Sequence, residues 1–283
     1  MTARQRRLPS KYAARRTLVG ETAYAVEVQL GGRDIGKVTK ALSERRHYHA
    51  AVNMVRLYKE PAQMFRRYLT SRGDYPFTTQ VKTPSGWLDL RLFTAHDVLT
   101  VNEIFCREDY RAEPEDKVVV DFGSNIGISA AYFLSRGPGV HAYLFEPLPA
   151  NIERLEVNLA RFQDRYTLEQ VAVGPTDGEV QFDWEETGRY GGVGAATGQT
   201  ITVKSRNSTT VLEEVVAAHG QIDVLKIDIE GLEDAVVTGI PQSLARHIRK
   251  IYVECDSDVN QLTDTHSLSR YGEISQFVRL PGI

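Results

Sequence analysis

The pattern of hydrophobic and polar positions changes near residue 118 of this 283-residue chain. Beyond that point, short apolar runs alternate with longer stretches that have apolar residues at helical spacing. The first run, VVVDF, is typical of a strand buried on both faces. Strands that alternate with helices predict an α/β fold with a doubly wound parallel sheet. The expected strands are 118–122, 141–147, 166–173, 223–231 and 250–256, with a further strand at 199–205 and helices at 126–136, 149–162, 209–220 and 240–250.

The part of the chain before this region has a mixed pattern. Residues 22–30 alternate between polar and apolar positions, which predicts a strand. Residues 41–69 have helical spacing, and Pro61 divides them into two expected helices. Residues 77–93 alternate on both sides of Pro84-Ser85-Gly86, a turn-forming triplet, and therefore predict a hairpin.

Charge is distributed unevenly along the chain, whose net charge is -3. Residues 1–72 contain 16 Lys and Arg but only 5 Asp and Glu, so they carry +11 and the remainder carries −14. A basic region of this kind binds an anionic partner such as RNA, or docks on the acidic remainder of its own or a neighbouring subunit. We favour docking because no nucleic-acid-binding motif is present. We divide the chain into a basic, mixed α/β N-terminal extension (1–96), which contacts substrate or another subunit, and an α/β domain (97–283).

Other features of the sequence narrow the class of protein. No apolar run approaches the roughly 18 residues needed to cross a bilayer, so we expect no transmembrane segment. The basic N-terminus is not followed by the apolar stretch of a secretory signal. Cys106 and Cys255 are far apart and lack CxxC spacing, which argues against a disulfide framework or a zinc site. We therefore expect a cytoplasmic protein.

Acidic residues and glycines follow the first two strands of the expected sheet. The first strand leads into Asp121-Phe122-Gly123-Ser124-Asn125-Ile126-Gly127, and the second ends near Glu146. Ligands bind at these strand ends in open parallel sheets, and glycines let the backbone approach a ligand closely. The turn lacks the GxGxxG pattern of dinucleotide-binding proteins. An acid at the strand end suits S-adenosylmethionine (SAM), which has no phosphate but carries an ammonium and a sulfonium, and Glu146 is placed to accept hydrogen bonds from ribose hydroxyls.

Charged residues also interrupt the fourth expected strand. Alternation places Lys226, Asp228 and Glu230 on one side of it, and Ile227 and Ile229 on the other. Charges in so apolar a strand are costly to bury unless they are paired or functional. These residues are therefore candidates for a catalytic site, and a Lys226–Asp228 pair that only orders the strand end is the structural alternative.

The motifs DFGSNIGISAAYF, FEPLPANIERLEVNL, DVLKIDIEGLEDAVV and IYVECD, in this order and spacing, resemble the FkbM methyltransferase family. The upstream segment DVLTVNEIFCREDY is also similar to the segment before the first strand in that family, so the resemblance covers about residues 97–256. It implies a class I methyltransferase fold, which is Rossmann-like, and SAM-dependent O-methylation of a hydroxyl on a sugar, glycoside or other natural-product intermediate. The sequence departs from the family pattern in two places. The usual final β-hairpin is not obvious, although YGEISQFVRL is expected to supply one of its strands, and residues 1–96 match the family poorly.

The resemblance also implies roles for individual residues. Asp121, Gly123, Asn125 and Gly127 would hold the methionine end of SAM, with Ser124 in the same turn. Glu146 would bind the ribose, and the segment that contains Ala172 would border the adenine. The acceptor cannot be carried over, because it is expected to contact the poorly matching residues 1–96.

Methyl transfer to a hydroxyl needs orientation and is helped by a general base. We favour Asp228 and Glu230 as base candidates, with Lys226 orienting them, and we keep His96, just before the helix that starts at Asp97, as an outside candidate. Glu254 is also placed near a strand end. The acids at these strand ends would suit Mg²⁺, but we do not expect a metal.

Three other functions are weighed. An NAD-dependent oxidoreductase would need GxGxxG and a YxxxK-type acid and base, and the sequence has neither. A nucleic-acid-binding or RNA-modifying protein would use the basic N-terminal region, but the DPPY-type tetrad of base N-methylation is absent. The basic stretch 41–69 could instead serve oligomerisation or a membrane surface, and its apolar spacing suits packing better than lipid insertion.

Overall fold

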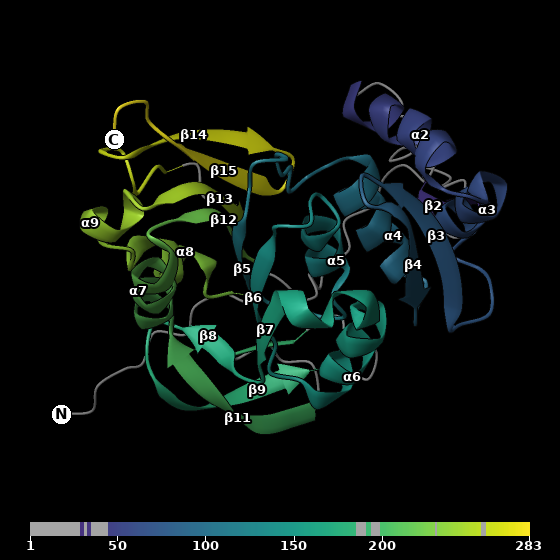
Figure 1. Ribbon diagram of the computed structural model, residues 1–283. Coiled ribbons are helices and arrows are strands. Elements are labelled where there is room, and N and C mark those ends of the chain that lie inside the picture. The colour runs from purple at the N-terminus through teal and green to yellow at the C-terminus, as the bar shows by residue number, and fades with distance from the viewer. Residues whose placement is uncertain are drawn as a thin grey trace, which may run out of the picture.

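The computed structural model describes residues 29–30, 33–34, 45–184, 191–193, 199–229, 231–255 and 259–283. Its centre is a seven-stranded sheet with the order β14-β15-β13-β12-β5-β6-β7 (Figure 1). Strands β7, β6, β5, β12 and β13 are parallel, whereas β15 is antiparallel to β13 and to β14. The predicted α/β fold with a doubly wound sheet is confirmed. The strands are β5 (Val118–Phe122), β6 (His141–Phe145), β7 (Tyr166–Glu169), β12 (Ile222–Ile227), β13 (Ile248–Glu254), β14 (His266–Tyr271) and β15 (Ile274–Arg279).

Helices cover both faces of this sheet, so the strands are buried from two sides. Alternation along β5 directs Val119 into one hydrophobic cluster and Val118 and Val120 into the other. The first cluster receives α5 (Ile128–Leu134), α6 (Pro149–Asn158) and η2 (Ala160–Arg165), and the second receives α7 (Ser208–His219), α8 (Glu233–Thr238) and α9 (Gln242–Ala245). A continuous apolar run such as VVVDF is the sequence counterpart of this double burial.

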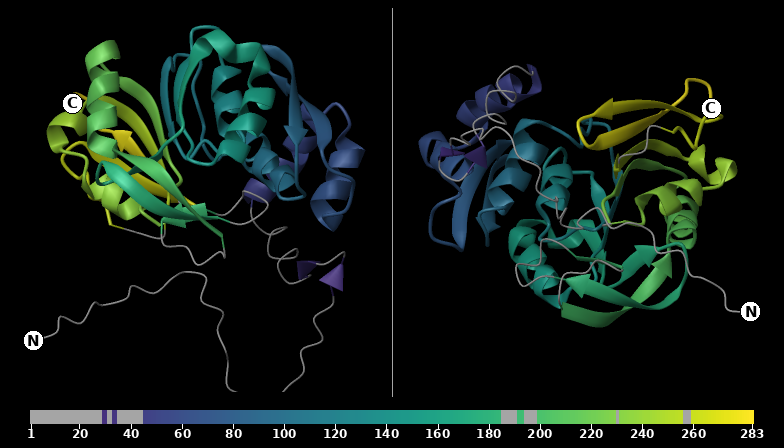
Figure 2. Two further views of the ribbon diagram at one scale, coloured as in Figure 1. Left: turned by 90° about the horizontal axis from the view of Figure 1, so that it is seen from below. Right: turned by 180° about the vertical axis from the view of Figure 1, so that it is seen from behind.

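The N-terminal part of the described chain packs against the first of these clusters (Figure 2). Pro61 occupies the first turn of α3, where its missing N–H costs no hydrogen bond, so the predicted division into two helices is confirmed. The predicted hairpin is also confirmed, with Thr83 paired to Gly86 at the turn. The elements are β1 (Gln29–Leu30), β2 (Arg33–Asp34), α2 (Arg45–Leu57), α3 (Pro61–Thr70), β3 (Phe77–Thr83), β4 (Gly86–Leu92), α4 (Asp97–Val101) and the π-helical turn η1 (Asn102–Cys106).

One buried side chain joins the β3–β4 hairpin to the central domain. Asn158, near the end of α6, accepts a hydrogen bond from the Arg91 backbone N–H (2.7 Å) and donates to the Arg91 carbonyl (3.2 Å). Its amide also donates to the Ile126 carbonyl at 2.9 Å, in the turn after β5. The hairpin, the helix and the turn are therefore held together by one amide. The domain boundary at residue 96 stays a prediction.

A second, four-stranded sheet follows β7 and has the order β10-β9-β11-β8, visible at the bottom of Figure 1. The prediction of one strand over 166–173 is wrong, because the chain turns after Glu169 and its continuation pairs with β11 instead. The predicted strand at 199–205 is confirmed within β11, whereas β9 and β10 were not predicted. Most of the strand predicted at 22–30 lies outside the described residues. The strands are β8 (Ala172–Gly174), β9 (Gly178–Trp184), β10 (Gly191–Val193) and β11 (Gln199–Asn207).

The C-terminal part of the domain corrects three expectations. Strand β12 ends at Ile227, before the charged segment that alternation had included in it. The helix expected over 240–250 is reduced to α9, because β13 already begins at Ile248, and α8 was not predicted. The final hairpin, of which one strand was expected, is complete as β14 and β15. Within the described residues, no helix combines the length and apolar character needed to cross a membrane.

Candidate active site

A cavity of about 390 Å³ opens where the central strands end. Its wall includes Gly123 after β5, Glu146 after β6, Asp228 after β12 and Glu254 at the end of β13. The carboxyl ends of parallel strands are where ligands bind in open α/β sheets, and this volume is in the range of small-molecule sites. The cavity is therefore the candidate active site.

The turn after β5 brings its backbone against the end of β12. Gly123 has φ +82°, and a Cβ built on it would lie 1.9 Å from the Asp228 carbonyl oxygen. Glycine is therefore required here for both conformation and space. The N–H groups of Gly123 and Ser124 both donate to the Phe145 carbonyl at 3.0 Å, which ties this turn to the end of β6. Asn125 adopts a left-handed conformation, with φ 47°, and lines the cavity.

Glu146 is buried in the cavity wall with its carboxylate oriented by three N–H donors. They are the backbone N–H of Asn125 (2.9 Å), the backbone N–H of Leu148 (3.0 Å) and the side-chain amide of Asn151 (3.2 Å). Burial raises the pKa of Glu146 to about 7, although these hydrogen bonds act in the opposite direction. Each oxygen keeps acceptor capacity, so the carboxylate can receive hydrogen bonds from ligand hydroxyls.

Lys226 links two carboxylates at the centre of the site. Its Nζ lies 3.0 Å from Asp121 Oδ1 and 3.3 Å from Asp228 Oδ2. Burial alone would lower the pKa of Lys226, but the two carboxylates raise it above its usual value, so this lysine stays charged. The sheet register sets this geometry, because Lys226 pairs with Asp121 on β5 and with Tyr252 on β13.

Of the predicted cofactor residues, Asp121 lies behind the wall rather than on it. Its side chain is completely buried, with one oxygen bound to Lys226 and the other accepting a hydrogen bond from Ser129 Oγ at 2.6 Å. Ser129 and Lys226 line the cavity, whereas Asp121 is absent from the described lining. In the structure Asp121 therefore orders residues that face the cavity.

The other predicted residues differ in their relation to the cavity. Ser124 lines it. Gly127, with φ +81°, starts α5, and the Cβ of a substituted residue would meet Leu155. Ala172 packs behind the wall, in a cluster with Leu148 and Phe182, which do line the cavity. His96 is exposed at the start of α4 and is outside the described lining, although its neighbour Asp97 contributes to it. Glu230 lies outside the described residues.

The segment before β5 contributes a part of the cavity wall that was not predicted from the sequence. Tyr110 is 5 % exposed and lies over Lys226, with Nζ 5.6 Å from its ring centroid. Arg107 binds the Asp109 carboxylate through two of its nitrogens, and Glu103 lies 3.7 Å from the same guanidinium. Glu103 comes from the π-helical turn η1, a type of irregularity that is frequent at functional sites. The signal in the sequence was the density of acids in NEIFCREDY beside a tyrosine.

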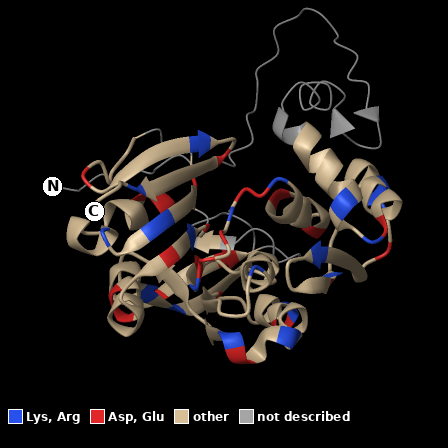
Figure 3. Cartoon of the chain, turned by 45° about the horizontal axis from the view of Figure 1, so that its top comes forward, with Lys and Arg blue, Asp and Glu red and all other residues tan. Residues whose placement is uncertain are grey.

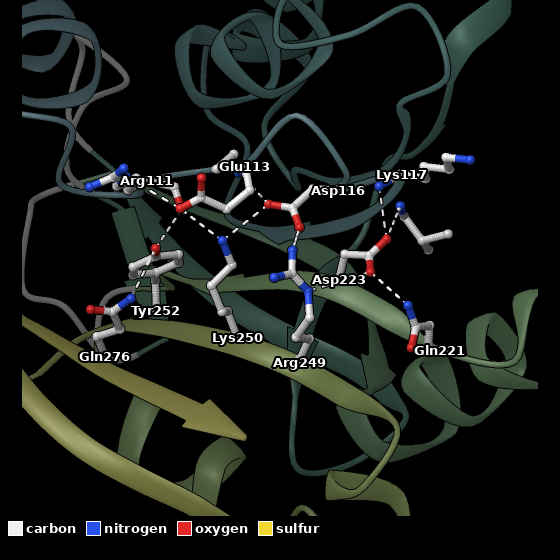
Figure 4. Close-up of polar contacts among 12 residues, drawn as sticks. Arg111, Glu113, Asp116, Lys117, Gln221, Asp223, Arg249, Lys250, Tyr252 and Gln276 are labelled. Carbon is white, nitrogen blue, oxygen red and sulfur yellow. Dashed lines mark hydrogen bonds and ion pairs between the residues drawn. The ribbon is translucent and has the colours of Figure 1, made fainter. Parts of the chain in front are cut away.

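A polar network holds this segment on the sheet (Figure 4). The Arg111 carbonyl accepts hydrogen bonds from Tyr252 Oη (2.5 Å) and Lys250 Nζ (3.3 Å). Lys250 also lies 3.1 Å from the buried Asp116 carboxylate. Since Tyr252 also packs edge-on against Tyr110, with 5.8 Å between ring centroids, the network supports the tyrosine that faces the cavity.

The cavity is acidic. Its described lining contains seven Asp and Glu residues but only two Lys and Arg residues. Figure 3 shows acidic residues, in red, around the middle of the molecule. The described residues contain no group of three or more His, Cys, Asp or Glu side chains arranged to hold a metal ion. Cys106 and Cys255 are both free and buried.

The methyltransferase FkbM domain matches residues 121–278, which is more than half of the 283-residue chain. The chain belongs to the FkbM methyltransferase family. This membership confirms the resemblance noted in the sequence, and the seven-stranded sheet with its covering helices has the class I methyltransferase fold. Family and fold together support methyl transfer from SAM.

Relatives of named activity are distant in sequence. The chain is 27% identical over 167 residues to the 2-O-methyltransferase NoeI of Sinorhizobium fredii, covering 50% of this chain and 64% of NoeI. It is 26% identical over 196 residues to the 31-O-demethyl-FK506 methyltransferase FkbM of Streptomyces tacrolimicus, covering 57% of this chain and 73% of that protein. It is 25% identical to the AMB antimetabolite synthetase AmbE of Pseudomonas aeruginosa over 70% of this chain but only 11% of AmbE. The chain thus spans less than two thirds of AmbE and of NoeI.

Among solved structures, the methyltransferase FkbM of Methylobacillus flagellatus KT is similar. The similarity covers 83% of this chain and 62% of that one, with 15% identity and a TM-score of 0.40.

Proposed function

We propose that this protein is a SAM-dependent O-methyltransferase that acts on a hydroxyl of a sugar, glycoside or other natural-product intermediate. One observation carries the proposal: the buried Glu146 carboxylate and the Lys226-paired Asp228 carboxylate lie on the wall of one cavity. The first suits a cofactor ribose and the second suits the activation of an acceptor. Family membership supplies the reaction class within which this geometry is interpreted.

The chemistry of the wall near β5 and β6 fits SAM. Glu146 can accept hydrogen bonds from ribose hydroxyls, and Leu148 and Phe182 provide an apolar surface for the adenine ring. The Gly123–Asn125 turn brings backbone close to the methionine end, and the acidic lining suits its ammonium and the sulfonium. Asp121 acts indirectly in this proposal, by holding Lys226 and Ser129 in place, and Ala172 supports the adenine wall from behind.

SAM supplies an electrophilic methyl group on a positively charged sulfur. The protein has to bring the acceptor oxygen in line with it and to accept the hydroxyl proton. Asp228 is the described carboxylate best placed for the proton, because it lines the cavity and 29% of its side chain is accessible. Lys226 holds that carboxylate in one orientation without giving up its own proton. Glu230 stays a second base candidate from the sequence.

The choice of a hydroxyl acceptor rests on the relatives. NoeI is a 2-O-methyltransferase, and FkbM is a 31-O-demethyl-FK506 methyltransferase. The alternative of an RNA-modifying protein is disfavoured by the acidic cavity, because a polyanion would be repelled there. Most of the basic region that motivated the RNA alternative lies outside the described residues.

Calorimetric titration tests this function. The protein is titrated with SAM and S-adenosylhomocysteine (SAH), with NAD as the control. We expect both sulfur compounds to bind in the micromolar range and NAD not to bind. Glu146→Ala should weaken SAH binding. Asp228→Asn, which removes the proposed base, should abolish most of the transfer of radiolabelled methyl groups to a panel of glycosides while the affinity for SAH is retained. Binding of NAD alone, or full transfer by Asp228→Asn, would contradict the proposal.

A further inference from the structure

The glycine turn after β5 has no backbone donor left for the carboxylate of SAM. Each backbone N–H from residue 123 to residue 127 already donates to an acceptor within the protein. The acceptors are the carbonyls of Phe145, which receives two of these bonds, and Ser124, a carboxylate oxygen of Glu146, and the side chain of Asn125. A carboxylate needs hydrogen-bond donors or a cation when it leaves water, so its partner has to be sought elsewhere on the wall.

Lys226 cannot supply that partner either. Its ammonium has three N–H groups, and three acceptors already surround it. They are Asp121 Oδ1 and the Gly123 carbonyl, each at 3.0 Å, and Asp228 Oδ2 at 3.3 Å. A fourth acceptor would have to displace one of these three.

Arg107 is the other cation of the described lining, and its guanidinium is only partly used. The edge formed by Nε and Nη2 donates to the Asp109 carboxylate, and Nη2 also lies 3.7 Å from Glu103. Within the described chain, Nη1 makes no hydrogen bond or ion pair. A guanidinium presents five N–H donors in a fixed plane, so the two on Nη1 remain available to a ligand.

The local structure directs this side chain to the cavity. The Arg107 backbone N–H donates to the Asn102 carbonyl at 2.9 Å, five residues earlier, and so closes the π-helical turn η1. The chain then reverses at Glu108, with φ 56°, and Tyr110 returns over Lys226. Arg107 therefore lines the same cavity as the turn after β5, and Asp109 holds its guanidinium in one orientation before a ligand binds.

We propose that Arg107 binds the carboxylate of the methionine end of SAM through Nη1, and that Asp109 is the positioning residue that orients the guanidinium. This inference rests on the proposed function, because it names a binding residue for the same cofactor. The carboxylate is the one charged group of SAM that the acidic wall repels. Hydrogen bonds between Arg and a carboxylate are among the strong ones in proteins, and a donor that is already oriented loses less entropy on binding.

Two ligands that differ only in the carboxylate test the proposal. SAH and S-adenosyl-3-thiopropylamine, which is SAH without its carboxylate, are each titrated into the full chain by calorimetry. We expect the native protein to bind SAH about tenfold more tightly than the decarboxylated analogue, as for one hydrogen bond between charged groups. Equal affinities for the two ligands would overturn the proposal.

Arg107→Gln should abolish this preference. The variant should bind SAH about tenfold more weakly than the native protein does, and its affinity for the analogue should stay within about twofold. Arg206→Gln is a matched control, because Arg206 also contacts two carboxylates, those of Glu169 and Glu214, and lies outside the described lining. Its side chain is 25% exposed, against 20% for Arg107. The control should leave both affinities unchanged, and an SAH preference that persists in Arg107→Gln would refute the assignment.

A double variant covers a folding defect in Arg107→Gln, which leaves the Asp109 carboxylate without its counter-ion. Arg107→Gln with Asp109→Asn removes both charges and should show the same loss of SAH preference. Asp109→Asn alone keeps the cation but releases its orientation, so the preference should fall by a smaller factor of about three. An unchanged ratio of the two affinities in Asp109→Asn would exclude the positioning role, since a purely structural role would not alter that ratio.

The same titrations separate this inference from the proposed function. No binding of SAH to the native protein would overturn both. Binding of SAH that is equally tight in the native protein and in Arg107→Gln would overturn the inference alone, because the carboxylate would then be held by another part of the wall.

Discussion

The Lys226 ammonium lies 3.0 Å from Asp121 Oδ1, between residues that are paired side by side on β12 and β5. Asp121 is fully buried and Lys226 is only 2% exposed, so both charges have lost most of their water. Such a pair is retained only when hydrogen bonds compensate the lost hydration. Here Ser129 and the Gly123 carbonyl provide them, and the pair thereby fixes the ends of the two central strands.

Loss of this lysine should destabilise the protein strongly. Lys226→Met leaves the Asp121 carboxylate buried without its counter-ion, for which we expect a loss of about 3–5 kcal/mol in urea unfolding. Adding Asp121→Asn should recover part of that loss, because the unpaired charge is removed. Lys204→Met, on the exposed side of β11, is the control and should change stability by less than about 0.5 kcal/mol. Similar losses of stability in Lys226→Met and Lys204→Met would contradict the argument that the buried ion pair with Asp121 stabilises the fold.

A methyl group at Gly123 should be poorly tolerated. In Gly123→Ala the new Cβ would lie 1.9 Å from the Asp228 carbonyl oxygen, so the turn or the end of β12 has to move. Gly220→Ala is a matched control, because Gly220 has φ +83° against +82° for Gly123 and has open space around its Cβ position. We expect about 1–2 kcal/mol for the control, from the left-handed conformation alone. Gly123→Ala should cost clearly more in thermal unfolding and should also weaken SAH binding, and equal costs would contradict the steric argument.

The affinity for SAH should increase with pH through a contribution from Glu146. The pKa of this carboxyl is raised from 4.5 to about 7, and ribose hydroxyls donate best to its ionised form. Binding should therefore strengthen about tenfold between about pH 6 and 8, as expected for one proton released. For folding the sign is opposite: the raised pKa makes Glu146 lower the free energy of unfolding as the pH rises from 4.5 toward 7.

Glu146→Gln separates this contribution from the titration of the ligand. The variant cannot ionise, so calorimetry should show a shallower pH dependence of SAH affinity than in the native protein. The same slope in both proteins would remove Glu146 from the binding step.

Removal of the Tyr252 hydroxyl should loosen the segment that carries Tyr110. Tyr252→Phe deletes the hydrogen bond to the Arg111 carbonyl and the one from Gln276 at 3.2 Å, at a cost of about 1–3 kcal/mol. Hydrogen exchange of residues 107–116 should increase while exchange in α7 stays unchanged. Tyr271→Phe, on a side chain that is 63% exposed, is the control. Unaltered exchange in 107–116 would show that the network in Figure 4 does not hold this segment.

The fold was predictable where the local hydrophobic pattern of a segment matches its burial in the folded protein. Strand β5 has the bounds expected from VVVDF, because a strand buried on both faces needs a continuous apolar run. The prediction of one strand over 166–173 was wrong because the alternation of polar and apolar residues continues where the chain leaves the central sheet and enters the second sheet. Val171 N–H donates to the Glu169 carbonyl and turns the chain, and Ala172 then pairs with Ser205, whose position is fixed by non-local contacts.

The types of residue at the site were predictable from the sequence, but which of them contact one another was not. Alternation placed Lys226 and Asp228 on one side, and the structure pairs them. It could not reveal that Asp121 faces Lys226, because the register between β5 and β12 is set by the packed sheet. Tyr110 and Tyr252 were missed for a similar reason, since their roles arise only when the segment before β5 lies across β13.

The three hydrogen bonds of Asn158 limit how freely the β3–β4 hairpin of this protein can be exchanged. If the β3–β4 hairpin were exchanged for that of another member, its backbone would have to meet the same amide at the position of Arg91. A misfit would be transmitted to Ile126 and so to the glycine turn at the cavity. The hairpin therefore cannot be replaced independently of the central domain. Chimeras joined near residue 96 should bind the cofactor more weakly unless Asn158 and its hydrogen-bond partners are transferred together.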